Sequence, residues 1–376
     1  MESKKIVIVA GEASGDLHAA SLVSALKALR PQVEFYGLGG RRMREAGVEL
    51  FCDLTRLSVV GFFEVIKHLK EIRGIFNSLV VKVEELQPDA VILVDYPGFN
   101  LRLAKELKRR GFKVIYYISP QIWAWGLKRM DLIRAVVDKM IVVFKFEEEL
   151  YKSYGVDVEF VGHPLLDLAK PRPSSLRLDE AGLAPNKTTI ALLPGSRNKE
   201  VARLLPIMLR ACAIFCQKNP GAQFLLLKAE TVDEEIFQAA LVNLKLPLAS
   251  ISNRTYDGLN ASDAAIVASG TATLQTAIME VPMVITYKVS FLTWAFARWL
   301  IKIPYIGLAN VVAGKKIVPE CVQFQARPEI IAGNLQQILA PDKYPAIKRE
   351  LVRVKKILGE PGASRRAAAI VARMLD

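Results

Sequence analysis

Two short turns in the second half of the chain have the residue types of a phosphate-binding site. The first, residues 194–197 (PGSR), follows an apolar run and precedes a polar, helix-compatible segment. A loop at a helix N-terminus directs backbone N–H groups and the positive end of the helix dipole toward one spot, where an anion binds well. Gly195 would permit close backbone approach, Ser196 could cap the helix, and Arg197 carries a planar group suited to phosphate. A Pro-Gly turn before a capped helix also occurs for structural reasons alone.

The second turn, residues 269–275 (SGTATLQ), repeats the order of strand, glycine and helix start. Two such turns in one domain fit a diphosphate better than either does alone. Gln275 would lie one turn into the helix, where its side chain could reach ribose hydroxyls. The predicted nucleotide-binding residues are therefore Gly195, Ser196, Arg197, Gly270, Thr271, Ala272, Thr273 and Gln275.

A carboxylate in the first half could carry out proton transfer. Asp95 directly follows the apolar run of residues 90–94, which predicts a carboxylate at the end of a buried strand. Partial loss of water there would raise its pKa and let it accept a proton from an alcohol. In the alternative interpretation, Asp95 only caps the helix that begins after Pro97.

Residues 11–16 (GEASGD) follow the first predicted strand, where dinucleotide-binding enzymes have a glycine-rich phosphate loop. The spacing is not GxGxxG, and Glu12 and Asp16 would repel a pyrophosphate, which argues against a dinucleotide-dependent oxidoreductase. The small residues, including Ser14, and the two carboxylates with His18 nearby suit sugar hydroxyls better. A plain strand-to-helix turn with Asp16 as its cap is the alternative.

Aromatic residues follow another predicted strand. Residues 118–129 (ISPQIWAWGLKR) contain Trp123 and Trp125, which could line a sugar or acyl site. The alternative is that these side chains only anchor the loop.

Residues 62–80 have apolar side chains at helical spacing with basic residues between them. This pattern predicts either an ordinary core-facing amphipathic helix or an interfacial membrane helix. Residues 291–301 (FLTWAFARWLI) are also compatible with a membrane interface. In the membrane interpretation, the contacting side chains are Phe62, Val65, Ile66 and Leu69.

The bulk composition restricts the class of protein. A length of 376 residues predicts two domains, and a formal net charge of +13 suits nucleic acid, an anionic membrane surface or a phosphorylated substrate. The chain has no RNA-binding aromatic signature and no DNA-reading helical module, so no nucleic-acid partner is predicted.

The start of the chain does not resemble a signal peptide, and no apolar stretch reaches the roughly 18 residues of a spanning helix. The four cysteines lack CxxC spacing. We therefore expect reduced thiols in a cytoplasmic protein and no metal site.

Short apolar runs alternate with amphipathic segments, which predicts parallel strands buried on both faces and covered by helices. The predicted strands are residues 5–10, 33–36, 90–94, 113–118, 139–143, 189–193, 223–227, 264–268 and 283–287. The predicted helices include residues 18–29, 204–217 and 272–279. Residues 163–173 contain three prolines and are typical of a connector. We expect an α/β protein of two doubly wound halves facing a cleft, where such sheets bind ligands.

Eight segments occur in the order seen in the lipid-A-disaccharide synthase family. They are GEASGD, VGFFEV, VDYPGFN, ISPQIWAW, VGHPLLD, LLPGSR, SGTATL and NVVAGKKIVPE, spread over residues 5–330. The chain thus resembles this family, which implies a GT-B glycosyltransferase with two Rossmann-like domains. The implied division is an acceptor- and membrane-facing domain at residues 1–168 and a UDP-sugar-binding domain at residues 169–344. Helices near residues 345–376 would pack back on the first domain.

The resemblance also implies a reaction. Family members transfer 2,3-diacylglucosamine from UDP-2,3-diacylglucosamine to 2,3-diacylglucosamine 1-phosphate, with inversion. The products are lipid A disaccharide 1-phosphate and UDP. The family is peripheral on the cytoplasmic face of the inner membrane and needs no bound metal or cofactor. We also allow for a homodimer.

Residue roles follow from the same resemblance. Asp95 matches the family's essential aspartate and is the expected base, with Glu12 or Asp16 in reserve, and Asn310 matches an asparagine near the nucleotide. The family usually has Glu where this chain has Gln275. Because a Gln carbonyl oxygen still accepts a hydrogen bond, we expect weaker nucleotide binding at most. The expected acceptor-sugar residues are Ser14, His18, Trp123 and Trp125.

Two other functions are compatible with parts of the pattern. Another UDP-sugar enzyme, such as a peptidoglycan N-acetylglucosaminyltransferase or a UDP-sugar epimerase, would share the diphosphate turns but not GEASGD together with ISPQIWAW. A non-enzymatic membrane- or RNA-binding protein would explain the charge but would leave PGSR, SGTATL and Asp95 without a role.

Overall fold

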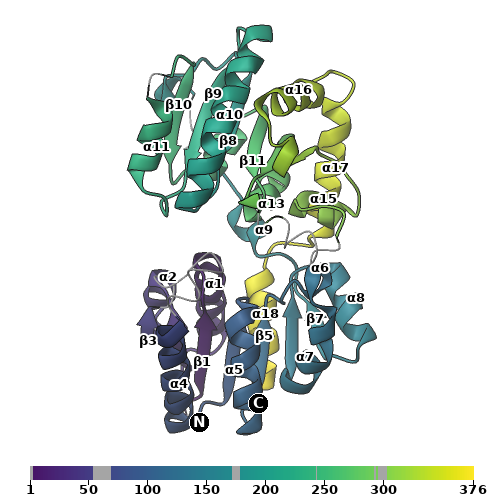
Figure 1. Ribbon diagram of the computed structural model, residues 1–376. Helices are drawn as coiled ribbons and strands as arrows, with labels where there is room; N and C mark the ends of the chain where they lie inside the picture. Colours follow the sequence, from purple (N-terminus) through teal and green to yellow (C-terminus); the bar gives the residue numbers. More distant parts are fainter. Residues whose placement is uncertain (1–2, 54–68, 172–177, 243, 292–293, 295–302) are drawn as a thin grey trace. The chain divides into compact units, whose positions relative to one another are not determined.

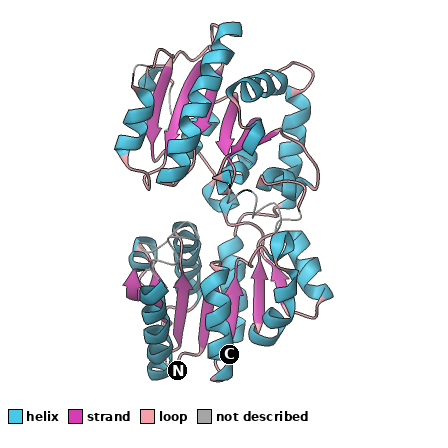
Figure 2. Ribbon diagram, viewed as in Figure 1, coloured by secondary structure: helices cyan, strands magenta, loops and turns pink. Residues whose placement is uncertain are grey.

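A computed structural model describes residues 3–53, 69–171, 178–242, 244–291, 294 and 303–376 (Figure 1). The chain forms two compact units. Unit 1 consists of Met1–Pro164 with Gly359–Asp376, and unit 2 of Leu165–Leu358. Both units have the predicted α/β class, with strands and helices alternating along the chain (Figure 2).

Within the described residues, unit 1 contains a seven-stranded parallel sheet in the order β3-β2-β1-β4-β5-β6-β7. The strands are β1 (Lys5–Ala10), β2 (Glu34–Gly39), β3 (Glu49–Asp53), β4 (Ala90–Val94), β5 (Val114–Tyr117), β6 (Lys139–Val142) and β7 (Val158–Phe160). β1 and β4 are buried at nearly every position, which is why they read as unbroken apolar runs.

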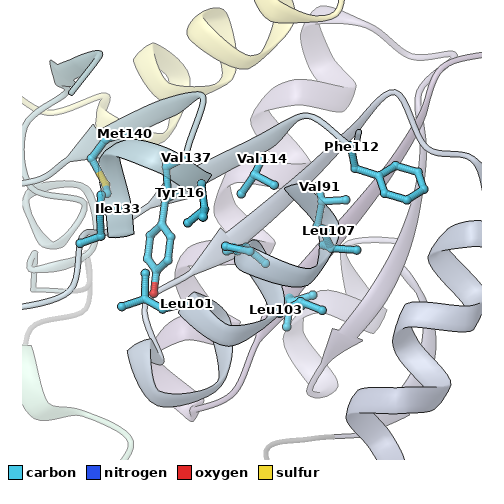
Figure 3. Close-up of a cluster of buried hydrophobic side chains, with 14 of the residues drawn as sticks. Val91, Leu101, Leu103, Leu107, Phe112, Val114, Tyr116, Ile133, Val137 and Met140 are labelled. Carbon is cyan, nitrogen blue, oxygen red and sulfur yellow. The ribbon is translucent and has the colours of Figure 1, made fainter. Parts of the chain in front are cut away.

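Helices cover both faces of this sheet (Figure 1). One face carries α4 (Leu69–Leu86), α5 (Pro97–Arg109) and α7 (Met130–Val136), whose apolar side chains pack with strand residues in a continuous core. Figure 3 shows side chains of α5 and α7 in this core together with strand residues. The other face carries α1 (Ala13–Leu29), which packs on α18 (Ala363–Met374) at the end of the chain. The remaining described helices of unit 1 are α2 (Arg41–Glu45), α6 (Ile122–Trp125), η2 (Leu127–Arg129) and α8 (Lys145–Ser153).

Unit 2 repeats the plan with a six-stranded parallel sheet among its described residues, in the order β10-β9-β8-β11-β12-β13. The strands are β8 (Thr189–Leu193), β9 (Gln223–Lys228), β10 (Leu248–Ser252), β11 (Ala264–Ala268), β12 (Met283–Tyr287) and β13 (Glu320–Val322). α10 (Asn198–Lys218) packs on α11 (Glu234–Leu241) and α16 (Pro328–Ile338), and their apolar faces close one core. The other described helices are α9 (Leu165–Leu168), η3 (Asp179–Ala181), α12 (Thr255–Asn260), α13 (Thr271–Ile278), α15 (Leu308–Ala313), η4 (Gln323–Gln325) and α17 (Tyr344–Ile357).

The predicted strands are confirmed, five of them (β1, β4, β8, β11 and β12) with the predicted bounds. The predicted loop at residues 11–16 is wrong in part, because α1 already begins at Ala13. The helix predicted from residue 204 begins earlier, at Asn198, and continues through Pro206.

The two C-terminal helices have different partners. We expected both to pack on the first domain, but α17 contacts α13 and α15 and belongs to unit 2. Only α18 returns to unit 1, where Arg30 forms an ion pair with Asp376.

The predicted membrane helix is described only from Leu69 onward, so Phe62, Val65 and Ile66 lie outside the described residues. In the described part, Leu79, Val80 and Val83 are buried in the core of unit 1, and Ile72, Ile75 and Phe76 pack against that core. Here the core-facing interpretation of the amphipathic pattern is correct.

Among the described residues, no helix combines the length and the apolar composition needed to cross a membrane. The same residues contain no group of three or more His, Cys, Asp or Glu side chains arranged to hold a metal ion. All four cysteines are free thiols.

We predict effects of different size for substitutions at two apolar residues of α4. Leu79 is buried and Val81 is half exposed. Leu79→Ala should therefore lower the free energy of unfolding of unit 1 by about 2–5 kcal/mol, because it leaves a cavity in the core. Val81→Ala should change that free energy by less than about 0.5 kcal/mol. Urea unfolding followed by circular dichroism measures both, and equal effects would contradict the core position of α4.

Candidate active site

The candidate site of unit 1 lies where its sheet reverses strand order. From β1 the chain builds outward to β2 and β3, and from β4 it builds the other way to β7. Ala10 and Val94, the last residues of β1 and β4, are register partners in this pair of strands. Glu12 and Asp95 follow these two residues at the topological switch point, where open α/β sheets bind ligands.

The backbone at Asp95 is held in a strained conformation. Asp95 and Tyr96 have φ values of 48° and 46°, in the left-handed region that non-glycine residues rarely adopt. The Asp95 carbonyl oxygen accepts hydrogen bonds from Asn100 Nδ2 (2.8 Å) and from the Tyr116 hydroxyl (2.5 Å). Strained residues persist where surrounding contacts fix them, and they are frequent at active sites.

The electrostatics of Asp95 suit a base. Burial, and then the negative charge of Glu12, raise its pKa to about 7, against the opposing effect of the Tyr96 backbone N–H. A carboxyl with this pKa can take a proton from an alcohol near neutral pH. In the alternative interpretation, Asp95 would only cap the helix that follows it. The structure does not support this interpretation, because the N-cap of α5 is Tyr96 and no side-chain capping bond is present there.

Asp16 has a structural role instead of the predicted role in proton transfer. It is buried, and its carboxylate accepts hydrogen bonds from the backbone N–H groups of Gly40 (2.7 Å), Arg42 (3.0 Å) and Met43 (3.1 Å). These are the donors at the N-terminus of α2, so Asp16 caps a neighbouring helix. Because both carboxylate oxygens accept hydrogen bonds from the backbone, Asp16 is not a suitable alternative to Asp95 as the base.

Of the predicted sugar-binding residues on α1, Ser14 is half-buried and His18 is buried. Burial lowers the pKa of His18 to about 4, so the imidazole is neutral at neutral pH. Its Nδ1 atom is buried and has no hydrogen-bond partner among the described residues. This position argues against the predicted contact between His18 and sugar hydroxyls.

The tryptophan loop brings an additional carboxylate to the same edge of the sheet. Trp123 is half-buried, and its Nε1–H donates to Glu147 Oε1 at 3.0 Å. The second tryptophan, Trp125, ends α6. Burial and the nearby charge of Asp95 raise the pKa of Glu147 to about 7, against the lowering effect of the neighbouring Ser119 and Trp123 side chains.

Glu147 was missed from the sequence because it lies in the charged run EEE (residues 147–149). A usable signal was present in the spacing. Phe144 and Tyr151 are buried, and Glu147 lies three residues after the first and four before the second. Residues at these separations share one face of a helix, which places this carboxylate on the inward side.

Unit 2 has its own switch point between β8 and β11, and the two predicted anion turns follow these strands. Leu193 and Val267 are register partners near the two strand ends. The predicted pairing of residues 194–197 with residues 269–275 therefore has a structural basis, because both turns lie at one edge of one sheet.

The shape of the first turn depends on Glu200. Its Oε2 atom accepts a hydrogen bond from the Ser196 backbone N–H (3.2 Å). Gly195 has φ 121°, and a Cβ atom there would lie 2.1 Å from Glu200 Oε2. Arg197, and not Ser196, is the N-cap of α10, without a side-chain capping bond. The Ser196 and Arg197 side chains are exposed.

The second turn begins with Gly270, the N-cap of α13, at φ 147°. Thr271 is exposed and Ala272 is half-buried. Thr273 is fully buried, and its hydroxyl donates to the Gly270 carbonyl oxygen and accepts from the Leu308 N–H. Thr273 therefore shapes the turn, and its hydroxyl proton is already used within it.

Gln275 is half-buried, and its Nε2 atom donates to the Tyr256 hydroxyl at 2.9 Å. This contact leaves the carbonyl oxygen as the acceptor, which is the atom that would replace a Glu carboxylate toward ribose. Tyr256 was not singled out from the sequence.

The Asn310 side chain holds a loop of unit 2 together, and its place near the nucleotide stays a prediction. It is fully buried, and Nδ2 donates to the Val318 carbonyl oxygen and to Glu320 Oε1. Its Oδ1 atom accepts from the N–H groups of Ile317 and Val318. All hydrogen-bonding capacity of the amide is used to fix the segment before β13.

Two doubly wound parallel units define the GT-B class of α/β proteins, and solved structures with this architecture match the whole chain. The calicheamicin glycosyltransferase CalG4 matches with a TM-score of 0.67 and 15% identity, covering 100% of this chain and 99% of that one. UDP-GlcNAc 2-epimerase from Neisseria meningitidis, bound to UDP-GlcNAc, matches with a TM-score of 0.67 and 12% identity, covering 98% and 100%. At this identity the likeness establishes the fold.

Sequence comparison identifies the family. The model of the lipid-A-disaccharide synthetase family matches residues 6–374. Lipid-A-disaccharide synthase from Syntrophus aciditrophicus is 48% identical over 375 residues, covering 98% of this chain and 97% of the relative. The enzyme from Trichlorobacter lovleyi is 44% identical over 378 residues, covering 99% and 98%. The chain belongs to the lipid-A-disaccharide synthase family and is a glycosyltransferase of lipid A biosynthesis.

The raised pKa of Asp95 predicts a pH-dependent effect on stability. Because the pKa is higher in the folded protein than in the unfolded chain, the contribution of Asp95 to stability is fully present below pH 4. It is lost as the pH rises through about 7. Asp95→Asn cannot ionise, so it should raise the free energy of unfolding by about 2 kcal/mol more at pH 8 than at pH 5. Denaturant unfolding at both pH values measures this difference.

The matched control is Asp131→Asn, because the side chain of Asp131 is exposed on α7. It should show no difference between the two pH values. The same gain at pH 5 and pH 8 for Asp95→Asn would contradict a raised pKa at this carboxyl.

Gly195→Ala should weaken UDP binding at least tenfold. The new Cβ would require an unfavourable φ and would displace the Glu200 carboxylate that orders the turn. Gly221→Ala is the control, since a Cβ at Gly221 meets nothing within 4 Å. Titration calorimetry with UDP compares the two variants, and an unchanged affinity in Gly195→Ala would exclude this turn from the diphosphate site.

Proposed function

We propose that this chain transfers 2,3-diacylglucosamine from UDP-2,3-diacylglucosamine to the 6-hydroxyl of 2,3-diacylglucosamine 1-phosphate. The products are lipid A disaccharide 1-phosphate and UDP. The observation that carries the residue assignment is the position of Asp95 at the switch point of unit 1, with a pKa of about 7. A carboxyl there is suited to deprotonate a sugar alcohol.

In the proposed step, Asp95 accepts the proton of the acceptor hydroxyl as its oxygen attacks the donor anomeric carbon from the side opposite the diphosphate. A new C–O bond forms, the bond to the diphosphate breaks, and its electron pair leaves with UDP. This in-line displacement inverts the anomeric centre. Glu12 assists by its charge, which keeps the pKa of Asp95 high enough to hold the proton.

The leaving diphosphate is assigned to unit 2. The N-termini of α10 and α13 both follow strands of the switch point and offer backbone N–H groups and positive dipole ends. The exposed Arg197 guanidinium supplies a full positive charge as negative charge develops on the diphosphate. Gly195, Ser196, Gly270, Thr271 and Ala272 form the two turns, and the Gln275 carbonyl oxygen accepts from a ribose hydroxyl.

The net charge of +13 fits substrates that carry phosphate and come from an anionic membrane surface. We therefore propose that the chain works as a peripheral protein at the cytoplasmic face of the inner membrane. The contact by Phe62, Val65, Ile66 and Leu69 stays a prediction, as does a homodimer.

Incubation of the purified chain with both substrates tests the proposal. We expect UDP and the disaccharide phosphate to form in equal amounts, while UDP-GlcNAc alone should not be epimerised. Asp95→Asn should lower kcat by at least about 100-fold, since it removes the base, and should leave the Kd for UDP within about threefold. Disaccharide formation at the wild-type rate by Asp95→Asn would remove Asp95 as the base.

A further inference from the structure

A buried carboxylate with no assigned role lies beside the proposed base. Glu147, on the first turn of α8, is 1% exposed. Its Oε1 atom accepts the hydrogen bond from Trp123 Nε1. Neither its Oε2 atom nor the buried Ser119 hydroxyl beside it has a partner of acceptable hydrogen-bond geometry among the described residues.

The neighbouring residue shows what a purely structural carboxylate does on this helix. Glu148 is also buried, but Lys145 and Lys152 pair with its two oxygens. Its pKa is lowered by these hydrogen bonds in spite of burial. Glu147 has the opposite shift, since burial and Asp95 raise its pKa to about 7. Burying a carboxyl with so little compensation destabilises the fold, and an apolar side chain would fill the space at less cost.

The hydrogen bond between Trp123 and Glu147 fixes an aromatic ring. Trp123 packs edge-on against Phe146, with ring centroids 5.3 Å apart, and Phe146 stacks on Phe144. The ring is therefore held by packing and the N–H by Glu147, while the half-buried indole keeps some surface accessible. An indole held in this way loses little conformational entropy when a ligand stacks on it.

The surroundings indicate which ligand this would be. Trp123 follows β5, which pairs with β4, the strand that precedes Asp95. Glu147 follows β6, the next strand beyond β5. The Tyr116 hydroxyl on β5 donates to the Asp95 carbonyl oxygen, so the end of β5 lies beside the proposed base. The charge of Asp95 also contributes to the raised pKa of Glu147. A pyranose presents an apolar C–H face to an aromatic ring and hydroxyls to a nearby carboxylate.

We propose that Glu147 is a positioning residue that holds the Trp123 indole as a stacking surface for the acceptor sugar, with the reactive hydroxyl toward Asp95. This inference rests on the proposed function and adds a subsite to it. The ligand class is a pyranoside whose exocyclic hydroxyl is the nucleophile. Glu147 does not touch the reacting atoms, and its effect passes through the indole.

Kinetics with three variants test the subsite. Glu147→Leu removes the acceptor of the indole hydrogen bond, and Trp123→Phe removes the donor. Each should raise KM for the acceptor about tenfold, with kcat and the KM for the UDP-sugar within about twofold. The double variant should show about the same tenfold change, because both substitutions break one contact. Glu147→Gln keeps an acceptor oxygen and should stay near wild type.

The contact itself has a readout that needs no substrate. The indole N–H signal of Trp123, assigned by its loss in Trp123→Phe, should shift in Glu147→Leu. It should not shift in Glu148→Gln, the matched control on the same helix. An unmoved signal in Glu147→Leu overturns the positioning role. A moved signal with unchanged acceptor KM in both Glu147→Leu and Trp123→Phe overturns the sugar subsite.

The two proposals can fail separately. If the wild-type chain releases no UDP with the two substrates, the proposed function and its subsite fall together, and the indole signal still decides the Glu147–Trp123 contact. If the wild-type chain is active and the variants behave like it, only the inference about Glu147 falls. Should Glu147→Leu not fold, Trp123→Phe and Glu147→Gln carry the same kinetic comparison.

Discussion

The arrangement of chemistry in this protein depends on one constraint, the reversal of strand order in each parallel sheet. Parallel strands need crossover helices, so all their carboxyl ends meet at one edge, and the two loops beside the reversal point diverge to opposite faces. In unit 1 these loops carry Glu12 and Asp95, and in unit 2 they carry the two glycine turns. Residues more than 70 positions apart in sequence thereby become neighbours, because the strands that precede them are adjacent in the sheet.

The interior of both sheets could be predicted from the sequence, but the sheet edges could not. β1, β4, β8 and β11 are buried on both faces, and this burial produces the unbroken apolar runs that identify a strand. The strands that escaped prediction are β3, β7, β10 and β13, each at an edge of its sheet. Edge strands are covered on fewer sides, so their sequences, such as VEF and LASIS, mix apolar and polar residues without a clear period.

Some residues of the candidate site could likewise be predicted from the sequence, and others could not. Asp95 and the two turns were predictable because each directly follows an apolar strand, and a strand end has a known place in a parallel sheet. The structural roles of Asp16 and Asn310 could not be predicted, because nothing local reveals that backbone groups elsewhere in the chain occupy their polar atoms. Glu147 was missed for the converse reason, since its isolation from compensating charges is a property of the fold and not of its neighbours in the chain.

The return of α18 to unit 1 has a consequence for how the protein is made. α18 packs on α1 although all of unit 2 lies between them in the sequence, and Arg366 donates a hydrogen bond to the Val161 carbonyl oxygen. A nascent chain that has left the ribosome through residue 164 therefore still lacks one layer of unit 1 until all of unit 2 has been translated. During that interval α1 lacks the helix that packs on it in the folded protein, so unit 1 cannot complete its packing before unit 2 has been translated.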